Sequence, residues 1–361
     1  MALGVPLLEV EGRDVIASGE VRTFIYVETT SGCAQYLLLM ETGDWQQWDG
    51  ILKNPEKSFR LRWGYATGEE ETWAKYRTVR CDYGTVSYAG AIIQPLLKGF
   101  DAGYALQERA APYAYTDKLV SEIVMEIAKR YGLKTDVKAT KGKVSLHQCT
   151  LPDAYFIQYI LKPLAVGSDG RSDYYFFIEN GDTLVFRPPE LTSVETYSFD
   201  LRVGGPRSLR VWVNRGDLAS NFSLSTEVRG FDAYAGESED WIANDNTVSL
   251  SKLSSKYPTA PRKPSRVILS TSPEEDASEV ELEAKAIWGQ SSRSLYQVKL
   301  RMEPQPLARP ATVVTLKVTD PDGKPHYTTG KYLVHKVKQI IRAKGSGAST
   351  ELYLERRGRE E

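Results

Sequence analysis

The chain is poor in the residues that most often carry chemistry. Its 361 residues include only three cysteines and three histidines. Cys33, Cys81 and Cys149 are odd in number and far apart, so they form neither a disulfide framework nor a Cys-x-x-Cys pair. We therefore expect three reduced, structural thiols in a protein made in the cytoplasm.

Other absences narrow the class of protein further. No run of about 18 apolar residues occurs, so we expect no membrane-spanning segment. The first residues, MALGVPLLEVEGRD, lack a basic leader and reach Glu9 early, which argues against a signal peptide. The 46 basic and 47 acidic residues give a formal net charge of -1, so no overall field draws in DNA or an anionic membrane.

The candidate catalytic and metal-binding groups are few. His147 and Cys149 are two residues apart, which on a strand would put both on one side and could suggest a nucleophile pair or a metal site. Two ligands are too few for zinc, and no family signature surrounds them. His326, in a predicted turn beside Pro325, and His335, in a predicted strand, are expected to be structural.

The remaining motifs also favour a non-enzymatic reading. The acidic groups at 69–71 and 274–276 could be imagined as a glycosidase dyad, but they are neighbours in polar stretches and are expected to be solvated. Residues 204–206, Gly-Gly-Pro, are expected to form a turn, and no phosphate loop, dinucleotide motif or nucleophile elbow occurs. We assign no catalytic, cofactor-binding or metal-binding residue and expect neither a cofactor nor an enzyme.

The C-terminal residues 331–361 hold eight Lys or Arg against four Glu. Such a basic end could touch a partner or nucleic acid. No basic-aromatic stacking pattern accompanies the charges, so a solvated strand face and tail is expected.

Strand-like patterns dominate residues 1–108. Aromatic residues make up 11% of the chain, with 21 tyrosines and seven tryptophans, which favours strands and interfaces. Short apolar runs separated by turn signals are typical of a β-barrel or sandwich. The predicted strands are 21–28, 35–40, 58–63, 77–81 and 91–97.

Residues 109–190 read as a small α+β module. Thr116 is expected to cap a helix with an apolar stripe at Leu119, Ile123 and Ile127, and Gly132 is expected to end it. A second helix is expected from about residue 150 to residue 163. The Asn-Gly pair at 180–181, between apolar runs at 174–178 and 183–187, predicts a β-hairpin.

Strands return in the last part of the chain. They are predicted at 208–213, 221–229, 295–302, 312–319, 332–341 and 350–354. Residues 244–272 are rich in Ser, Pro and Lys and are expected to be an exposed linker or loop. Ser272, followed by Pro and Glu, is expected to begin a short helix that turns Ala284 inward.

The tetrapeptide GFDA occurs twice, at 99–102 and at 230–233. In each copy a predicted strand runs into the motif, and a Tyr and a Gly follow within a few residues. We interpret the repeat as a mark of two related β domains on either side of the α+β module. The alternative is chance combined with a shared turn preference.

This order of elements resembles the tail-hub or baseplate-hub proteins of tailed phages, whose relatives include late control protein D and the N-terminal part of type VI secretion spike proteins. The resemblance rests on TDKLVSEIVMEIAKRYG, on LPDAYFIQYILKPLA followed by YYFFIENGDTLVFRP, and on GKYLVHKVKQIIRAKGSGASTELYLERR. The chain departs from the family at 308–311, where Ala-Arg-Pro-Ala stands in place of the usual Pro-Gly.

The resemblance implies an α+β, mainly β, fold with two tube-like β-barrel domains flanking a small α/β module, plus a short helical insertion. The corresponding ranges are 1–108 for the first barrel, 109–190 for the module, 191–246 and 292–361 for the two parts of the second barrel, and 247–291 for the linker and helix insertion.

The resemblance also implies a function. The chain would be a structural hub of a phage tail tip or baseplate in the virion, a homotrimer with pseudo-sixfold symmetry. Its partners would be the tail tube or distal tail proteins, a separate central spike protein and the tape-measure protein, with DNA only as passing cargo. The alternatives are a tail-associated cell-wall hydrolase or peptidase and a carbohydrate-binding tail-tip protein.

Overall fold

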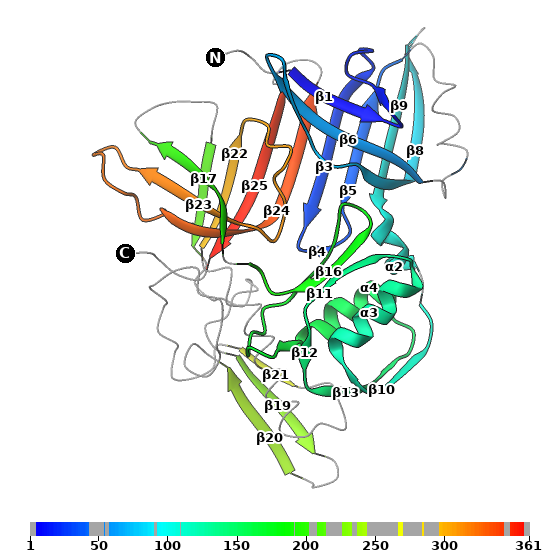
Figure 1. Ribbon diagram of the computed structural model, residues 1–361, viewed down its shortest axis with the longest axis vertical. Helices are drawn as coiled ribbons and strands as arrows, with labels where there is room; N and C mark the ends of the chain where they lie inside the picture. Colours follow the sequence, from blue (N-terminus) through cyan, green and yellow to red (C-terminus); the bar gives the residue numbers. More distant parts are fainter. Residues whose placement is uncertain are drawn as a thin grey trace.

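The computed structural model describes residues 5–42, 54, 58–89, 92–108, 110–190, 192–201, 208–213, 226–232, 237–243, 266–269, 284, 296–342 and 347–356. Strands make up most of these residues, so the predicted α+β, mainly β, class is confirmed. A broad β layer lies above a small module with helices, and a separate small sheet lies beyond the module (Figure 1). Among the described residues, no helix is both long and apolar enough to cross a lipid bilayer.

The N-terminal part of the chain forms six main strands that we call the first β unit. They pair in the order β3-β5-β9-β8-β6-β1, and all of these pairs are antiparallel. The short strands β2 (Arg13–Asp14) and β7 (Glu70–Trp73) extend β1 and β6. The six strands are β1 (Val5–Val10), β3 (Val21–Thr29), β5 (Gln35–Met40), β6 (Ser58–Thr67), β8 (Arg77–Ala89) and β9 (Ile92–Asp101).

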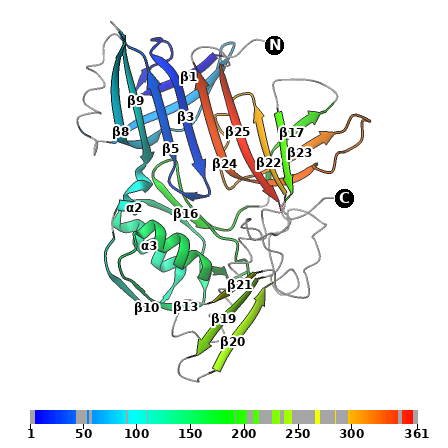
Figure 2. The ribbon, with the colours of Figure 1, turned by 180° about the vertical axis from the view of Figure 1, so that it is seen from behind.

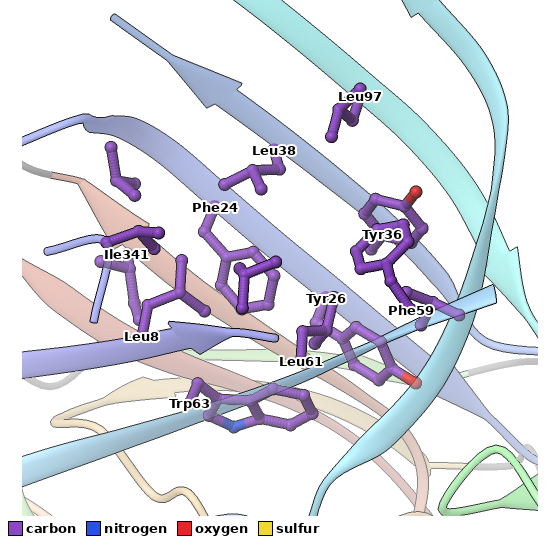
Figure 3. Packing of buried hydrophobic residues seen from close by; sticks show 14 of the residues in the cluster. Leu8, Phe24, Tyr26, Tyr36, Leu38, Phe59, Leu61, Trp63, Leu97 and Ile341 are labelled. Atoms are coloured by element: carbon purple, nitrogen blue, oxygen red, sulfur yellow. The ribbon is translucent and has the colours of Figure 1, made fainter. Parts of the chain in front are cut away.

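The first β unit is held by one aromatic-rich core. Successive side chains of a strand point to opposite faces, so β3 buries Phe24 and Tyr26 while its other face stays half-buried. The Tyr26 and Trp63 rings lie 4.5 Å apart between centroids. Figure 3 shows these rings among Leu8, Leu38 and Leu61.

The C-terminal part forms another six strands, the second β unit. Their pairing order is β18-β22-β25-β24-β23-β17. The strands are β17 (Ser193–Asp200), β18 (Ser208–Val213), β22 (Tyr296–Met302), β23 (Val313–Thr319), β24 (Gly330–Arg342) and β25 (Ala348–Arg356).

The α/β module lies between the two units in chain order and beneath the β layer in space (Figure 1). It contains a four-stranded sheet of order β11-β16-β15-β4 and two small ladders, β10-β13 and β12-β14. The elements are β4 (Ser31–Gly32), η1 (Ala102–Tyr104), α2 (Ala105–Glu108), β10 (Tyr113–Leu119), α3 (Val120–Arg130), β11 (Lys134–Val137), β12 (Thr140–Lys141), β13 (Lys143–Gln148), α4 (Asp153–Tyr155), the π-helical turn Phe156–Leu161, the 3-10 turn Lys162–Leu164, β14 (Val166–Gly167), β15 (Tyr175–Glu179) and β16 (Thr183–Arg187).

The first predicted helix begins later than expected. Thr116 is not its cap, because residues up to Leu119 pair with β13 across a bulge at which Asp117 takes a φ of 52°. Helix α3 starts at Val120, and the Glu122 carboxylate accepts the Leu119 N–H at 2.9 Å. The apolar stripe is buried and Gly132, with a φ of 64°, follows the last turn as predicted.

The predicted hairpin forms and is buried on both faces. Asn180 and Gly181 take φ values of 55° and 74°, as the Asn-Gly signal requires. On one face Phe176, Ile178 and their neighbours join the core around α3. On the other face Tyr175, Phe177 and Val185 pack against Ala311, Val313 and Leu333 of the second β unit.

The same hairpin also contacts the first β unit. Residues Phe176 and Phe177 of β15 pair in parallel with Ser31 and Gly32 of β4. At the tip, a Cβ on Gly181 would lie 2.8 Å from the Thr78 carbonyl oxygen of β8, so only glycine fits. The hairpin therefore lies wedged between the module helices and both β units.

The second GFDA copy does not lie in the second β unit. It does end a strand, β19 (Thr226–Asp232). However, β19 pairs with β20 (Glu237–Ala243) and β21 (Arg266–Leu269) in a separate three-stranded sheet, seen at the bottom of Figure 1 and Figure 2. The expectation that both copies close equivalent β domains is therefore wrong.

The region predicted as linker and helical insertion is only partly described. Strand β21 lies within the stretch expected to be an exposed linker. The predicted helix after Ser272 lies outside the described residues, except for Ala284, which is helical and buried. The division of the chain into five domain ranges stays a prediction.

We expect the hairpin wedge to control the stability of the whole chain. Phe177→Ala removes a buried ring between β15 and the second β unit, and should lower the free energy of unfolding by about 3 kcal/mol. Urea denaturation followed by fluorescence measures this. The control Tyr155→Ala removes a ring that is 50% exposed and should change stability by less than about 0.5 kcal/mol. Equal effects of the two substitutions would contradict the wedge.

Candidate assembly interface

The residues that the sequence suggested as candidate catalytic or metal-binding groups lie at the end of β13, in a turn and in β24. His147 lies near the end of β13 and is exposed, and Cys149 follows that strand and is exposed as well. His326 Nδ1 lies 2.8 Å from Thr328 Oγ1 in a turn, and His335 lies within β24. All three cysteines are free, and no three His, Cys, Asp or Glu side chains converge on a metal-sized site within the described part of the chain.

The structure describes part of the stretches that the sequence analysis singled out. Glu71 of β7 is exposed and accepts a hydrogen bond from Trp73 Nε1 at 2.9 Å. The residues at 204–206 and 274–276 lie outside the described residues. In the basic C-terminal stretch, Lys331 and Arg342 are exposed, but Arg356 is fully buried and donates to the Thr329 and Tyr327 carbonyls, contrary to the expected solvated face.

What the structure does show is an internal duplication of strand order. We number the strands of each β unit from first to sixth in chain order. In both units, neighbouring strands of the sheet then follow the same order: second, third, sixth, fifth, fourth, first. The fifth strand of each unit carries a bulge against the sixth, at Asp82 in β8 and at His335 in β24. The units differ at one joint, since β1 and β6 are antiparallel whereas β17 and β23 are parallel.

The duplication extends to individual core positions. Aligning the two bulges superposes the pairing registers of strands three to six residue for residue. Eight core positions of the first unit are then matched by core positions of the second. The matched buried pairs are Tyr36 with Val298, Leu38 with Leu300, Met40 with Met302, Phe59 with Val314, Leu61 with Leu316, Val79 with Tyr332, Cys81 with Val334 and Leu97 with Leu352.

The two units are joined side by side by a direct strand pair. After its bulge, β24 pairs antiparallel with β3, from Lys336 opposite Thr29 to Arg342 opposite Thr23. Ile341 thereby enters the core of the first unit, where Figure 3 shows it near Leu8 and Phe24. The result is one continuous run of eight strands, β18-β22-β25-β24-β3-β5-β9-β8.

The first GFDA copy ends the sixth strand of the first unit and has a local structural role. A Cβ on Gly99 would lie 1.8 Å from the Arg80 carbonyl oxygen, so the close approach of β8 requires glycine. Phe100 stacks on Tyr104 with ring centroids 4.5 Å apart. Asp101 is fully buried and accepts the N–H groups of Ala34 and Gly103, each at 2.9 Å.

The matching position in the second unit is Arg356, which lies opposite Tyr296 in the ladder. Both units therefore end their sixth strand on a buried ionisable side chain that binds backbone groups. Asp101 accepts from amide groups, whereas Arg356 donates to carbonyl groups. The structural duplication has no sequence identity at this point, and GFDA at 230–233 is not its counterpart.

Both ends of the eight-stranded run carry edges without a strand partner in the described residues. Before its bulge, β8 pairs with β6 from Arg77 to Arg80, but after the bulge it pairs only with β9. At the other end, β18 pairs only with β22. These two edges and the β24–β3 joint together define the candidate assembly interface.

Comparisons with known proteins agree with this architecture. No protein-family model matches the chain, and no curated protein sequence matches it. Among solved structures, it is similar to a tail protein from Neisseria meningitidis, with a TM-score of 0.65 and 11% identity over 98% of this chain and 96% of that one. A 43 kDa tail protein of prophage MuSo2 from Shewanella oneidensis gives a TM-score of 0.63 and 13% identity, with 98% of both chains covered.

A third structure links the fold to secretion machinery. It is an Escherichia coli component of the type VI secretion system, described as similar to the T4 bacteriophage tail proteins gp27 and gp5. Its TM-score is 0.54 at 11% identity, over 96% of this chain and 76% of that one. The predicted resemblance to the phage tail-hub family is thus confirmed as a likeness of fold, shared by phage tail proteins and spike-related secretion proteins.

We expect the buried Asp101 to make stability depend on pH. Burial raises the pKa of this carboxyl to about 8, against the opposing effect of the Ala34 and Gly103 amide hydrogen bonds. The unfolded chain loses this proton near pH 4, whereas the folded chain keeps it to about pH 8, so the carboxyl lowers stability as pH rises between those values.

The test compares urea unfolding of the wild type and Asp101→Asn between about pH 5 and about pH 8. The free energy of unfolding of the wild type minus that of the variant should fall with rising pH, by at most about 1.4 kcal/mol per pH unit. Asp82→Asn, at an exposed position, is the matched control and should leave the pH profile unchanged. A difference that grows with pH would show that the carboxyl is stabilised in its charged form.

Proposed function

We propose that this chain is a structural hub of a phage tail tip or baseplate and assembles as a homotrimer. The observation that supports this most directly is the internal duplication, in which two units of equal strand order lie side by side in one sheet. Three copies would place six similar units around one axis. Such a ring matches a sixfold tail tube on one side and a threefold spike on the other.

The eight-stranded run has one covered face and one open face, which supports a ring around a channel. One face of the eight-stranded run is covered by the cores of the two β units, with β1 and β6 over one half and β17 and β23 over the other. Three copies would contribute 24 strands to the ring, eight from each chain. The core-covered face would then point outward, and the opposite face would line the channel.

The proposed channel face carries an excess of cations above the module. Lys336 and Lys338 follow the β24 bulge on the face opposite the buried Val337. Lys299 Nζ lies 2.9 Å from Glu351 Oε2 on the neighbouring strands, which offsets one charge. A surface of this kind suits the passage of an extended tape-measure protein and then of DNA, because both can slide past it without a base-specific or sequence-specific grip.

The same proposal assigns the partners. A tail tube or distal tail protein would bind one rim of the ring, and a central spike would bind the other. The similar structures include the PdpA-VgrG complex of Francisella, with a TM-score of 0.52 and 9% identity over 98% of this chain and 52% of that one. We propose a non-enzymatic role in the virion for the present chain, with no cofactor.

Size-exclusion chromatography with light scattering tests the assembly. The purified chain should have three times the mass of one polypeptide at micromolar concentration. Electron-microscope images down the particle axis should show six similar lobes around a central hole. A persistent monomer, a dimer or a ring without threefold symmetry would refute the proposed hub.

A further inference from the structure

We propose that adjacent copies join by pairing β8 of one chain with β18 of the next, in the register of the β24–β3 joint. This inference rests on the proposed trimer and names the surface and partner that build it. The partner is a second copy of the same chain, and the contact is an antiparallel β-ladder.

The first argument is the duplication itself. β24 and β8 are both fifth strands with a bulge, and β3 and β18 are both second strands that pair with the third. Within the chain, the fifth strand of one unit pairs beyond its bulge with the second strand of the other unit. Only the reciprocal joint, from β8 to β18, is missing in a single copy, and a neighbouring copy supplies it.

The internal joint also predicts the register. When Asp82 is aligned with His335, residues 337–342 of β24 correspond to residues 84–89 of β8. In the same alignment, the β3–β5 and β18–β22 ladders make Ser208 of β18 the counterpart of Thr23 of β3. The pairs between copies are then Gly84 with Val213, Thr85 with Trp212, Val86 with Val211, Ser87 with Arg210, Tyr88 with Leu209 and Ala89 with Ser208.

Hydrogen-bond direction is consistent with this joint. Ile93 exchanges both of its backbone hydrogen bonds with Thr42, at 3.2 and 2.9 Å, so the backbone groups of Gln94 point the other way, toward Ser87 of β8. Because backbone groups alternate in direction along a strand, the N–H and carbonyl of Val86 then point out from the open edge. Within the described part of the chain no strand pairs with this edge, so the Val86 backbone groups point toward the position that Val211 of the next copy takes in the predicted register.

The composition of the edge fits a contact between chains. Residues 83–89 read Tyr-Gly-Thr-Val-Ser-Tyr-Ala and contain no charge and no proline. Sheet edges that must stay unpaired usually carry charged residues or proline, which block pairing. β8 and the strands of the second unit also lie at opposite ends of the β layer, as Figure 1 and Figure 2 both show, which lets each copy bind a neighbour on either side.

A cysteine pair tests the register in the full chain. In a Cys149→Ser background, Ser87→Cys with Arg210→Cys places the two thiols at a non-hydrogen-bonded antiparallel pair, where Cα atoms lie about 4.5 Å apart and a disulfide fits. The control is Tyr83→Cys with Arg210→Cys. Its cysteine lies four residues further along the same strand face, about 13 Å out of register.

Mild oxidation should link the first pair into covalent trimers on a non-reducing gel, at least about tenfold faster than the control pair. A chain that is trimeric in solution but shows no linkage, or links equally in both variants, overturns this joint and leaves the proposed hub standing. A chain that stays monomeric overturns the hub and the joint together.

A backbone substitution tests the hydrogen bonds. Val86→Pro removes the N–H that points out from the edge, while Val86→Ala shortens the side chain and keeps that N–H. The proline variant should lose the trimer and the alanine variant should keep it, with similar far-ultraviolet circular dichroism. A trimeric proline variant overturns the joint. The cysteine pair leaves Val86 intact and decides the matter if the proline variant does not fold.

Discussion

The hydrogen-bonded ladder between β24 and β3 is the contact on which the rest of the architecture depends. It joins the two β units into one sheet and fixes their relative position through direct strand pairing. The bulge at His335 makes this possible, because it lets one edge of β24 serve β23 before the bulge and β3 after it. A long strand with two successive partners is thus the element that relates one unit to the next.

The hairpin of β15 and β16 fixes the third part of the molecule to that sheet. Its strands are apolar on both faces, which is typical of a strand covered on both sides. One face belongs to the helix core of the module and the other to the second β unit, and Arg309 Nη1 lies 3.0 Å from Glu179 Oε1 at its end. The module therefore sits at a defined place beneath the sheet, which a ring of identical copies requires.

The two β units keep the same strand order and share eight matched core positions, mostly with different side chains. Cys81 corresponds to Val334, Gly99 to Leu354 and Asp101 to Arg356. Core packing tolerates such exchanges when the neighbouring volumes change together. This explains why the duplication is visible in the pairing registers, whereas the only repeated tetrapeptide, GFDA, points to a strand in a different sheet.

The sequence by itself determined the mainly β class, the Asn180-Gly181 hairpin, the stripe of α3 and most strand positions, because alternation and turn chemistry are local. It also led to the resemblance of fold that the solved structures bear out. Only the tertiary structure decided which strands pair, why the α3 helix starts at Val120, why Arg356 is buried and where the open edges lie. Those features depend on hydrogen bonds between residues far apart in the chain, and a local pattern carries no information about the partner that a strand will find.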